Sequence, residues 1–158
     1  MTDITLRLAM REDAADIVPV IRRAFAQYDG KLVPPSGALH ETEATVAARI
    51  DTERCIVAFD GASPIACIFY KRVGDQLYFG RLAVLPDRRG EGLAQRLVAE
   101  VEAAARTAGL AAVTLGVRIA LPGNVAMFAA LGYREIGREA HSGFSEPTSI
   151  TMEKRLGE

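Results

Sequence analysis

The chain has 158 residues, a length that suits one domain over residues 1–158 with one hydrophobic core. Hydrophobic residues make up 49% and charged residues 25%, as in ordinary globular proteins. Nineteen Lys and Arg nearly balance twenty Asp and Glu, so the net charge of −1 excludes bulk attraction to nucleic acid or to an anionic membrane. Since we find no apolar run near the ~20 residues that span a bilayer and no signal-peptide pattern, we expect a cytoplasmic protein.

Apolar periodicity predicts one strand and two helices in the amino-terminal third of the chain. Alternating apolar and polar residues indicate a strand over 4–10. Helical spacing predicts helices over 17–28, with Pro19 near the start, and over 41–50. Glycines and prolines indicate a loop over 29–40.

A hairpin and a third strand follow. Apolar runs over 55–59 and 65–70 flank Asp60-Gly61, a typical hairpin turn. After another turn at Gly74-Asp75, a strand is expected over 77–84. The middle of the chain therefore supplies three antiparallel strands.

The two cysteines, Cys55 and Cys67, fall on the two strands of this hairpin. We interpret them as buried free thiols. Metal binding is not expected, because the chain has no CxxC and its two histidines, His40 and His141, are far apart in sequence.

The carboxyl-terminal half alternates helices and strands. Residues 93–105 form a helical stripe that Gly109 ends. After it we expect, in order, a strand over 112–117, a short helix over 124–131 stopped by Gly132, and a closing pair of strands over 133–140 and 149–154. The whole order is β-α-α-β-β-β-α-β-α-β-β, which predicts a mixed α/β layer fold.

The stretch LPDRRGEGLAQRL indicates an anion site, because a glycine loop after a strand opens a helix beside two arginines. The GxxxxGK[ST] loop of nucleotide hydrolases is absent. The dinucleotide pattern GxGxxG would begin at Gly90 but has Gln95 at its third position. The pattern R/Q-x-x-G-x-G/A fits completely over Arg89–Ala94.

That pattern resembles motif A of the GNAT superfamily, the acyl-CoA-dependent N-acyltransferases. LAVLPDRRGEGLAQRL has the family's strand, turn and amphipathic helix, and NVAMFAALGYRE is similar to its motif B. The element order matches over essentially the whole chain. The resemblance implies a mixed, largely antiparallel central sheet flanked by helices, with splayed fourth and fifth strands.

The resemblance also implies an acyl-CoA donor, usually acetyl-CoA. The diphosphate would bind the Arg89 side chain and the backbone amides of Arg89, Gly90, Glu91, Gly92, Leu93 and Ala94. The pantetheine arm would pair with the strand edge at Leu82, Ala83 and Val84. Asn124 at the start of the motif B helix would help to hold the arm, or would act as a helix N-cap, or both.

An amine would attack the thioester, with a backbone N–H stabilising the oxyanion. Many family members use a tyrosine in motif B to protonate the leaving thiolate, but Phe128 occupies that position beside the cofactor here. Tyr78 and His141 are weaker catalytic candidates. Each has a plainer interpretation, Tyr78 as an edge or core aromatic residue and His141 as a solvated turn residue.

The resemblance implies that the acceptor enters between the first helical loop and the last hairpin, which would place Tyr28, Glu41 and Phe144 near it. Glu41 could attract a cationic amine, or it could be a solvated helix start. The leading hypothesis is acetyl transfer from acetyl-CoA to a primary amine of a small molecule. The alternatives are a protein or peptide N-terminal acetyltransferase and a catalytically weak acyl-CoA-binding sensor. A homodimer is possible.

Overall fold

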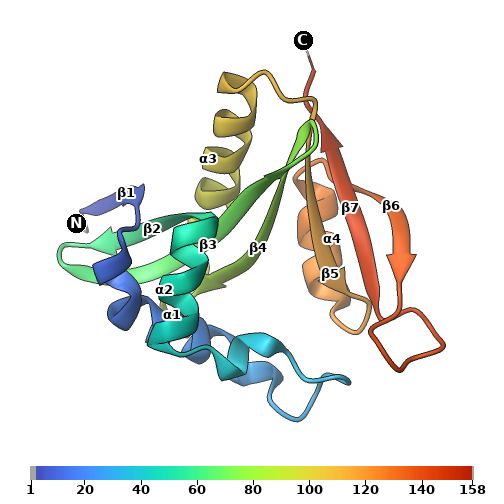
Figure 1. The fold of residues 1–158 in the computed structure, drawn as a ribbon, viewed down its shortest axis with the longest axis horizontal. Coiled ribbons are helices and arrows are strands. Elements are labelled where there is room, and N and C mark those ends of the chain that lie inside the picture. Colours follow the sequence, from blue (N-terminus) through green and yellow to red (C-terminus); the bar gives the residue numbers. More distant parts are fainter. Residues whose placement is uncertain (1–2, 158) are drawn as a thin grey trace. The chain divides into compact units, whose positions relative to one another are not determined.

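The computed structural model describes residues 3–157, and their elements follow the expected order. Short 3-10 turns separate several of them. The strands are β1 (Ile4–Leu8), β2 (Arg54–Asp60), β3 (Ser63–Val73), β4 (Gln76–Val84), β5 (Ala112–Arg118), β6 (Arg134–Glu139) and β7 (Ser149–Arg155). The helices are α1 (Ala14–Phe25), α2 (Glu43–Thr52), α3 (Leu93–Thr107) and α4 (Pro122–Ala130), as Figure 1 shows.

The seven described strands form one sheet in the order β1-β2-β3-β4-β5-β7-β6. Its recorded pairs are antiparallel except for the parallel pair of β4 and β5. The mixed, largely antiparallel α/β fold is therefore confirmed. By its contacts the chain forms two compact units, one extending to Lys71 and including Arg81–Glu100, the other combining Arg72–Gly80 with the chain from Val101 onward. The expectation of a single domain stays a prediction.

In the first unit, α1 and α2 lie together on one side of β2 and β3 (Figure 1). The inward stripe of α1 follows helical spacing, and it meets alternate residues of the two strands, including Cys55, Val57, Cys67 and Phe69. Both cysteines are buried free thiols, as expected. The intervening strand residues, among them Ile56 and Ile68, are buried as well, so both faces of this hairpin are covered.

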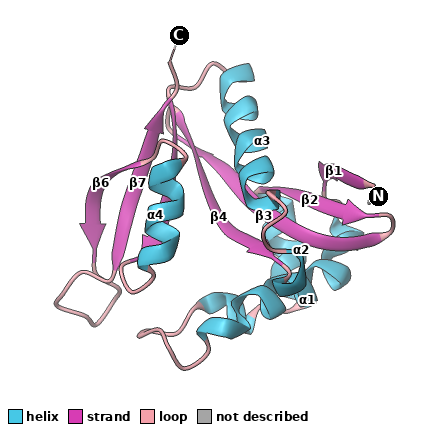
Figure 2. Cartoon of the chain, turned by 180° about the vertical axis from the view of Figure 1, so that it is seen from behind, coloured by secondary structure: helices cyan, strands magenta, loops and turns pink. Residues whose placement is uncertain are grey.

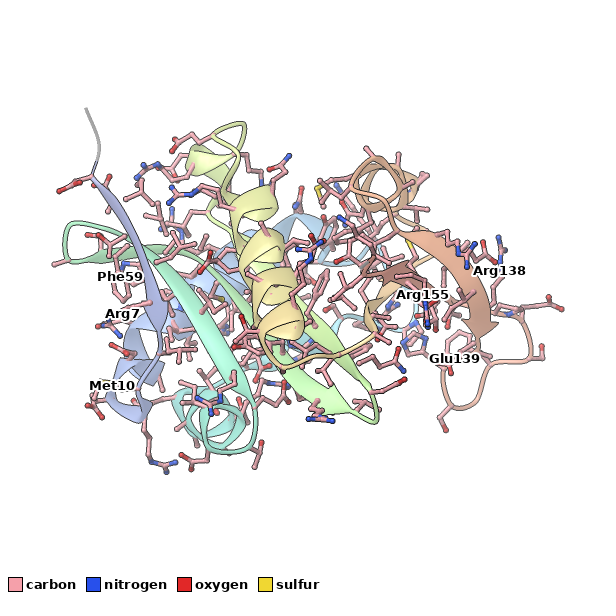
Figure 3. All side chains as sticks on the ribbon, turned by 90° about the horizontal axis from the view of Figure 1, so that it is seen from above. Arg7, Met10, Phe59, Arg138, Glu139 and Arg155 are labelled. Carbon is pink, nitrogen blue, oxygen red and sulfur yellow. The ribbon has the colours of Figure 1, made fainter. Side chains whose placement is uncertain are left out.

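The β1 strand closes one edge of the sheet by pairing with β2 from Ile4↔Asp60 to Leu8↔Ile56. The Arg7 guanidinium lies over the Phe59 ring, 4.4 Å from its centroid, and covers this apolar residue (Figure 3).

Among the described helices, none has the length and apolar character needed to cross a bilayer.

Three helix starts differ from the sequence prediction, each for a local reason. The α1 helix begins at Ala14, so Pro19 lies in its second turn rather than near its start. The α2 helix begins after Thr42, whose side-chain oxygen accepts from the Thr45 amide. The α4 helix begins at Pro122, a residue suited to the first helical position.

In the second unit, β4 and β5 pair in parallel only from Gln76↔Ala112 to Phe79↔Leu115. Both strands continue beyond these residues, so the recorded pairing covers only their amino-terminal parts, as expected for splayed strands. The β5 strand then pairs antiparallel with β7, and β7 with β6. The α4 helix packs against β5, and Figure 2 shows α4 from the side on which it lies in front of the strands of this unit.

The core of the second unit contains a buried polar cluster. The Tyr133 hydroxyl donates to Glu102 on α3 at 2.8 Å, and Lys154 on β7 donates to the same carboxylate at 3.1 Å. Phe79 and Phe128 pack with the Tyr133 ring, with centroid distances of 5.8 to 6.3 Å. The buried Glu102 charge is thus compensated by hydrogen bonds from β7 and from the residue that precedes β6.

Candidate functional site

The connection from β4 to α3 is the segment that the sequence singles out. It leaves β4 at Val84 and passes through the 3-10 turn Pro86–Arg88. The Leu85 amide donates to the Ile65 carbonyl at 2.9 Å and fixes the exit from the strand. Gly90 and Gly92 follow with φ of +82° and +79°, a left-handed conformation that favours glycine.

Backbone donors gather at this turn. The Arg96 amide donates to the Gly92 carbonyl at 3.0 Å, which begins the hydrogen bonding of α3. Arg89 and Gly90 form a hydrogen-bonded turn, and over the described part of the chain no bond to a backbone carbonyl is recorded from the amides of residues 92–95. A Cβ added at Gly90 or Gly92 would meet no described atom within 4 Å. The turn is therefore an open cradle of amide donors at a positive helix end, which is suited to an anion.

The two arginines of the loop have different partners. The Arg89 guanidinium donates to the Ala24 carbonyl at the end of α1, at 3.0 Å. Arg88 donates to Asp60 and to Glu91, and these hydrogen bonds, chiefly the one to Glu91, raise its pKa. Arg89 is thus tied to α1, and a contribution of its side chain to anion binding stays a prediction.

The last part of β4 carries an unusual backbone conformation at Arg81. Its φ of 51° lies in the left-handed region, which costs a non-glycine residue about 1–3 kcal/mol. The Arg81 Nε donates to Glu41 at 2.8 Å. This bond lies immediately before Leu82, Ala83 and Val84, the residues expected to offer their edge to a ligand.

Glu41 is 4% exposed, so its interpretation as a solvated helix start is wrong. Its carboxylate accepts from Arg81, from Arg49 at 3.1 Å and from the Thr45 hydroxyl at 2.6 Å. Burial acts to raise the pKa of Glu41, but the hydrogen bonds from Thr45 and Arg81 and the two arginine charges outweigh it, so this pKa lies below its ordinary value. Attraction of a cationic acceptor by Glu41 stays a prediction, and both carboxylate oxygens already have partners here.

Tyr78 lies on β4 opposite Thr114 of β5, one residue before the pairing ends. A Cβ on Gly116 would lie 3.1 Å from the Tyr78 hydroxyl. The hydroxyl therefore lies over Gly116, just beyond the last paired residues of these strands. This placement of Tyr78 is compatible with both interpretations from the sequence, a catalytic residue and a packing aromatic.

Two further candidates of the second unit, Asn124 and Phe128, lie on α4. Phe128 is buried against Phe79 and Tyr133, so packing accounts for its burial. Asn124 is the third residue of α4 and Leu121 is its N-cap, which overturns the interpretation of Asn124 as a cap. Contacts of Phe128 or Asn124 with a cofactor stay predictions.

His141 lies, as expected, between the last two strands, after β6 (Figure 3 labels Glu139 at its end). Its Nδ1 contacts the Thr148 hydroxyl, and its amide donates to the same oxygen at 3.0 Å. Phe144 in this turn is 38% exposed.

In the first unit, Tyr28 packs edge-on against Phe25 at a centroid distance of 5.9 Å.

The first unit thus holds the glycine cradle, the Leu82–Val84 edge, Tyr28 and Glu41, and the second unit holds the remaining candidates. Sequence reasoning missed Asp60 and Arg81 as partners of site residues. The Arg88–Glu91 pair could have been predicted from its i,i+3 spacing. The contacts of Arg88 with Asp60 and of Arg81 with Glu41 could not, because they join segments that are distant in sequence. Within residues 3–157, no group of three or more His, Cys, Asp and Glu could hold a metal ion.

Comparison with known proteins identifies the class. Residues 19–133 match the acetyltransferase (GNAT) family, which is most of the chain, and the protein belongs to this family. No curated protein sequence matches it.

Solved structures share the fold at low sequence identity. PaiA N-acetyltransferase from Thermoplasma acidophilum, solved with coenzyme A, has a TM-score of 0.81 at 18% identity, covering 98% of this chain and 99% of its own. The ribosomal-protein alanine N-acetyltransferase from Escherichia coli has a TM-score of 0.79 at 19% identity, with 99% and 96% covered. YncA from Salmonella typhimurium, solved with its cofactor acetyl-CoA, has a TM-score of 0.70 at 16% identity, with 99% and 95% covered.

The Glu41 cluster generates a pH-dependent prediction. At pH 7 we expect Glu41→Gln to lower the free energy of unfolding by about 1–3 kcal/mol, because two arginines lose their buried counter-charge. The lowered pKa of Glu41 means that its stabilisation is present above the unfolded value of ~4.3 and is lost as pH falls through the folded value. Urea unfolding from pH 7 to pH 2.5 should therefore show parent and variant converging in acid.

Glu139→Gln is a control at an exposed glutamate of β6, and it should leave stability within about 0.5 kcal/mol at pH 7. A Glu41→Gln deficit that is the same at every pH would contradict the assignment of its charge as the stabilising feature.

Proposed function

We propose that this protein transfers an acetyl group from acetyl-CoA to a primary amine of a small-molecule acceptor by direct attack on the thioester. The observation that supports this most strongly is the open cradle of amides at residues 92–95, found in a member of an acetyltransferase family. Acetyl-CoA would supply the activated acetyl group, and the chain's own residues would bind and orient the reactants.

Backbone groups of the first unit would bind the donor and stabilise the transition state in three ways. The amides of residues 92–95 would bind the diphosphate oxygens, as helix amino ends bind phosphate. The backbone of Leu82–Val84 would pair with the amide-containing arm of the donor. A backbone N–H of the same strand would donate to the developing oxyanion, where a fixed donor is worth about 10²–10³ in rate.

Tyr78 is the proposed proton donor to the leaving thiolate. Phe128 has no proton to donate at the position where many family members carry tyrosine. The Tyr78 hydroxyl lies over Gly116, just past the last recorded pair of β4 and β5. His141 is the proposed base for the acceptor ammonium, with its Nδ1 bound to Thr148 and its orientation set by that contact.

The function is tested by a panel of acceptors. We expect free thiol release from acetyl-CoA with at least one small primary amine, and little release with peptides bearing a free N-terminus. Turnover with peptides alone would favour the N-terminal acetyltransferase instead. Thermal stabilisation by CoA without turnover on any acceptor would favour an acyl-CoA sensor.

Gly92→Val should abolish CoA binding, because its branched side chain would occupy the open space that a phosphate oxygen needs. Gly109→Val is the matched control, since Gly109 has a similar φ of +72° and also has no described atom near its Cβ position. At CoA 100-fold above its Kd, thermal unfolding should show a gain of about 2.7 kcal/mol in the parent and in Gly109→Val. Equal stabilisation of Gly92→Val would show that the cradle is misassigned.

Tyr78→Phe tests the proton donor. We expect kcat to fall by about 10²-fold or more with CoA affinity unchanged, which is the range for loss of a general acid. Tyr70→Phe, at a half-buried tyrosine of β3, is the matched control and should retain kcat. An unchanged kcat in Tyr78→Phe, or an equal loss in both variants, would assign Tyr78 to packing.

A further inference from the structure

Arg88 joins two carboxylates around the glycine cradle. Its Nη1 donates to Asp60 of the β2–β3 hairpin at 2.8 Å. Its Nε and Nη2 donate to the two oxygens of Glu91 at 3.0 and 3.1 Å, a bidentate pair. The Arg88 side chain is only 17% exposed, although the loop lies at the surface.

Glu91 presents an electrostatic problem for the function proposed above. It stands between Gly90 and Gly92, beside the amides of the cradle, and carries a negative charge where a diphosphate would bind. The Glu91 carboxylate and a bound diphosphate would repel each other, and solvent and salt screen this repulsion only partly near a protein surface. A carboxylate free to rotate there would compete with the ligand for the same amide donors.

The geometry resolves this conflict, because both Glu91 oxygens accept from Arg88. Asp60 holds the opposite side of the same guanidinium and so fixes its position. Arg88 neutralises the Glu91 charge and keeps its oxygens on the guanidinium.

We propose that Arg88 is a positioning residue that keeps the Glu91 carboxylate out of the anion cradle, with Asp60 holding Arg88 in place. The proposal rests on the proposed function, in which the cradle binds the diphosphate of CoA. It assigns the role of Arg88 to the neutralisation of a neighbouring acid rather than to direct contact with phosphate.

This role differs from simple bracing of the loop in one measurable respect. If Arg88 only connects the loop to the hairpin, then its loss harms binding whatever residue stands at position 91. If Arg88 controls Glu91, then removing the Glu91 charge restores the binding that is lost without Arg88. A double-mutant cycle separates the two cases.

The experiment measures the Kd for CoA by calorimetry in Arg88→Met, Glu91→Gln and the double variant. We expect Arg88→Met to bind CoA about tenfold more weakly at 50 mM KCl, and less than threefold more weakly at 500 mM KCl, because salt screens the exposed carboxylate. The double variant should bind within about threefold of the parent, and Glu91→Gln alone should bind at least as tightly as the parent.

The chain offers a matched control on β6. Arg138 makes the same bidentate i,i+3 arrangement with Glu135, with Nε at 2.6 Å and Nη2 at 3.1 Å, and Figure 3 labels it. Arg138→Met should leave the Kd for CoA unchanged. If Arg88→Met does not fold, Arg88→Lys keeps the charge without the fork and should show about a threefold loss that Glu91→Gln also restores.

Three results would overturn the proposal: a Kd in Arg88→Met equal to that of the parent, no restoration in the double variant, or an equal loss in Arg138→Met. Failure of the proposed function has a different signature, since the parent itself would then not bind CoA at millimolar concentration. Pantetheine, which lacks the diphosphate, completes the test and should bind the parent and Arg88→Met equally.

Discussion

The donors left without backbone partners at the amino end of α3 are the constraint around which the rest of the site is built. Every helix begins with amides that its own backbone does not bond, and a Ser, Thr or Asp before the first turn commonly supplies an acceptor. Here Gly92 precedes Leu93, so the preceding residue has no side-chain acceptor, and two left-handed glycines add further amides to the same turn. Three hydrogen bonds then fix this turn to its surroundings. They join Leu85 to Ile65 of β3, Arg89 to Ala24 of α1, and Arg88 to Asp60 of the β2–β3 hairpin.

Most of the fold was predictable because apolar periodicity reports local geometry. The α1 stripe and the alternation in β2 reflect burial within one element, and the glycine turns mark where elements end. Boundaries were harder, since Thr42 and Pro122 set the starts of α2 and α4 through capping chemistry that hydrophobic spacing does not record. The placement of β7 between β5 and β6 depends on pairing between distant segments, and no local pattern encodes it.

The candidate site likewise combines features that local sequence predicts with features that only tertiary contacts create. The glycine and arginine spacing of residues 89–94 is local, so the sequence alone was enough to indicate an anion cradle. Glu41 was misjudged because its neighbours in sequence indicate an exposed helix start, whereas its partner Arg81 lies 40 residues further along. The strained φ of Arg81 likewise follows from tertiary contacts, since a guanidinium held by a buried carboxylate can offset part of the strain in its own backbone.

The aromatic residues of the second unit bear on where an acid could act. Tyr133 is 3% exposed and its hydroxyl donates to Glu102, while burial, together with that carboxylate, raises the pKa of Tyr133 far above its ordinary value. It is therefore fixed as a protonated structural donor. Phe128 packs with both Tyr133 and Phe79, and these two rings also contact each other, so the three rings form one aromatic cluster. Tyr78 is only half-buried and lies where β4 and β5 stop pairing, so the proposed proton transfer places the phenol on the strand rather than on the α4 helix.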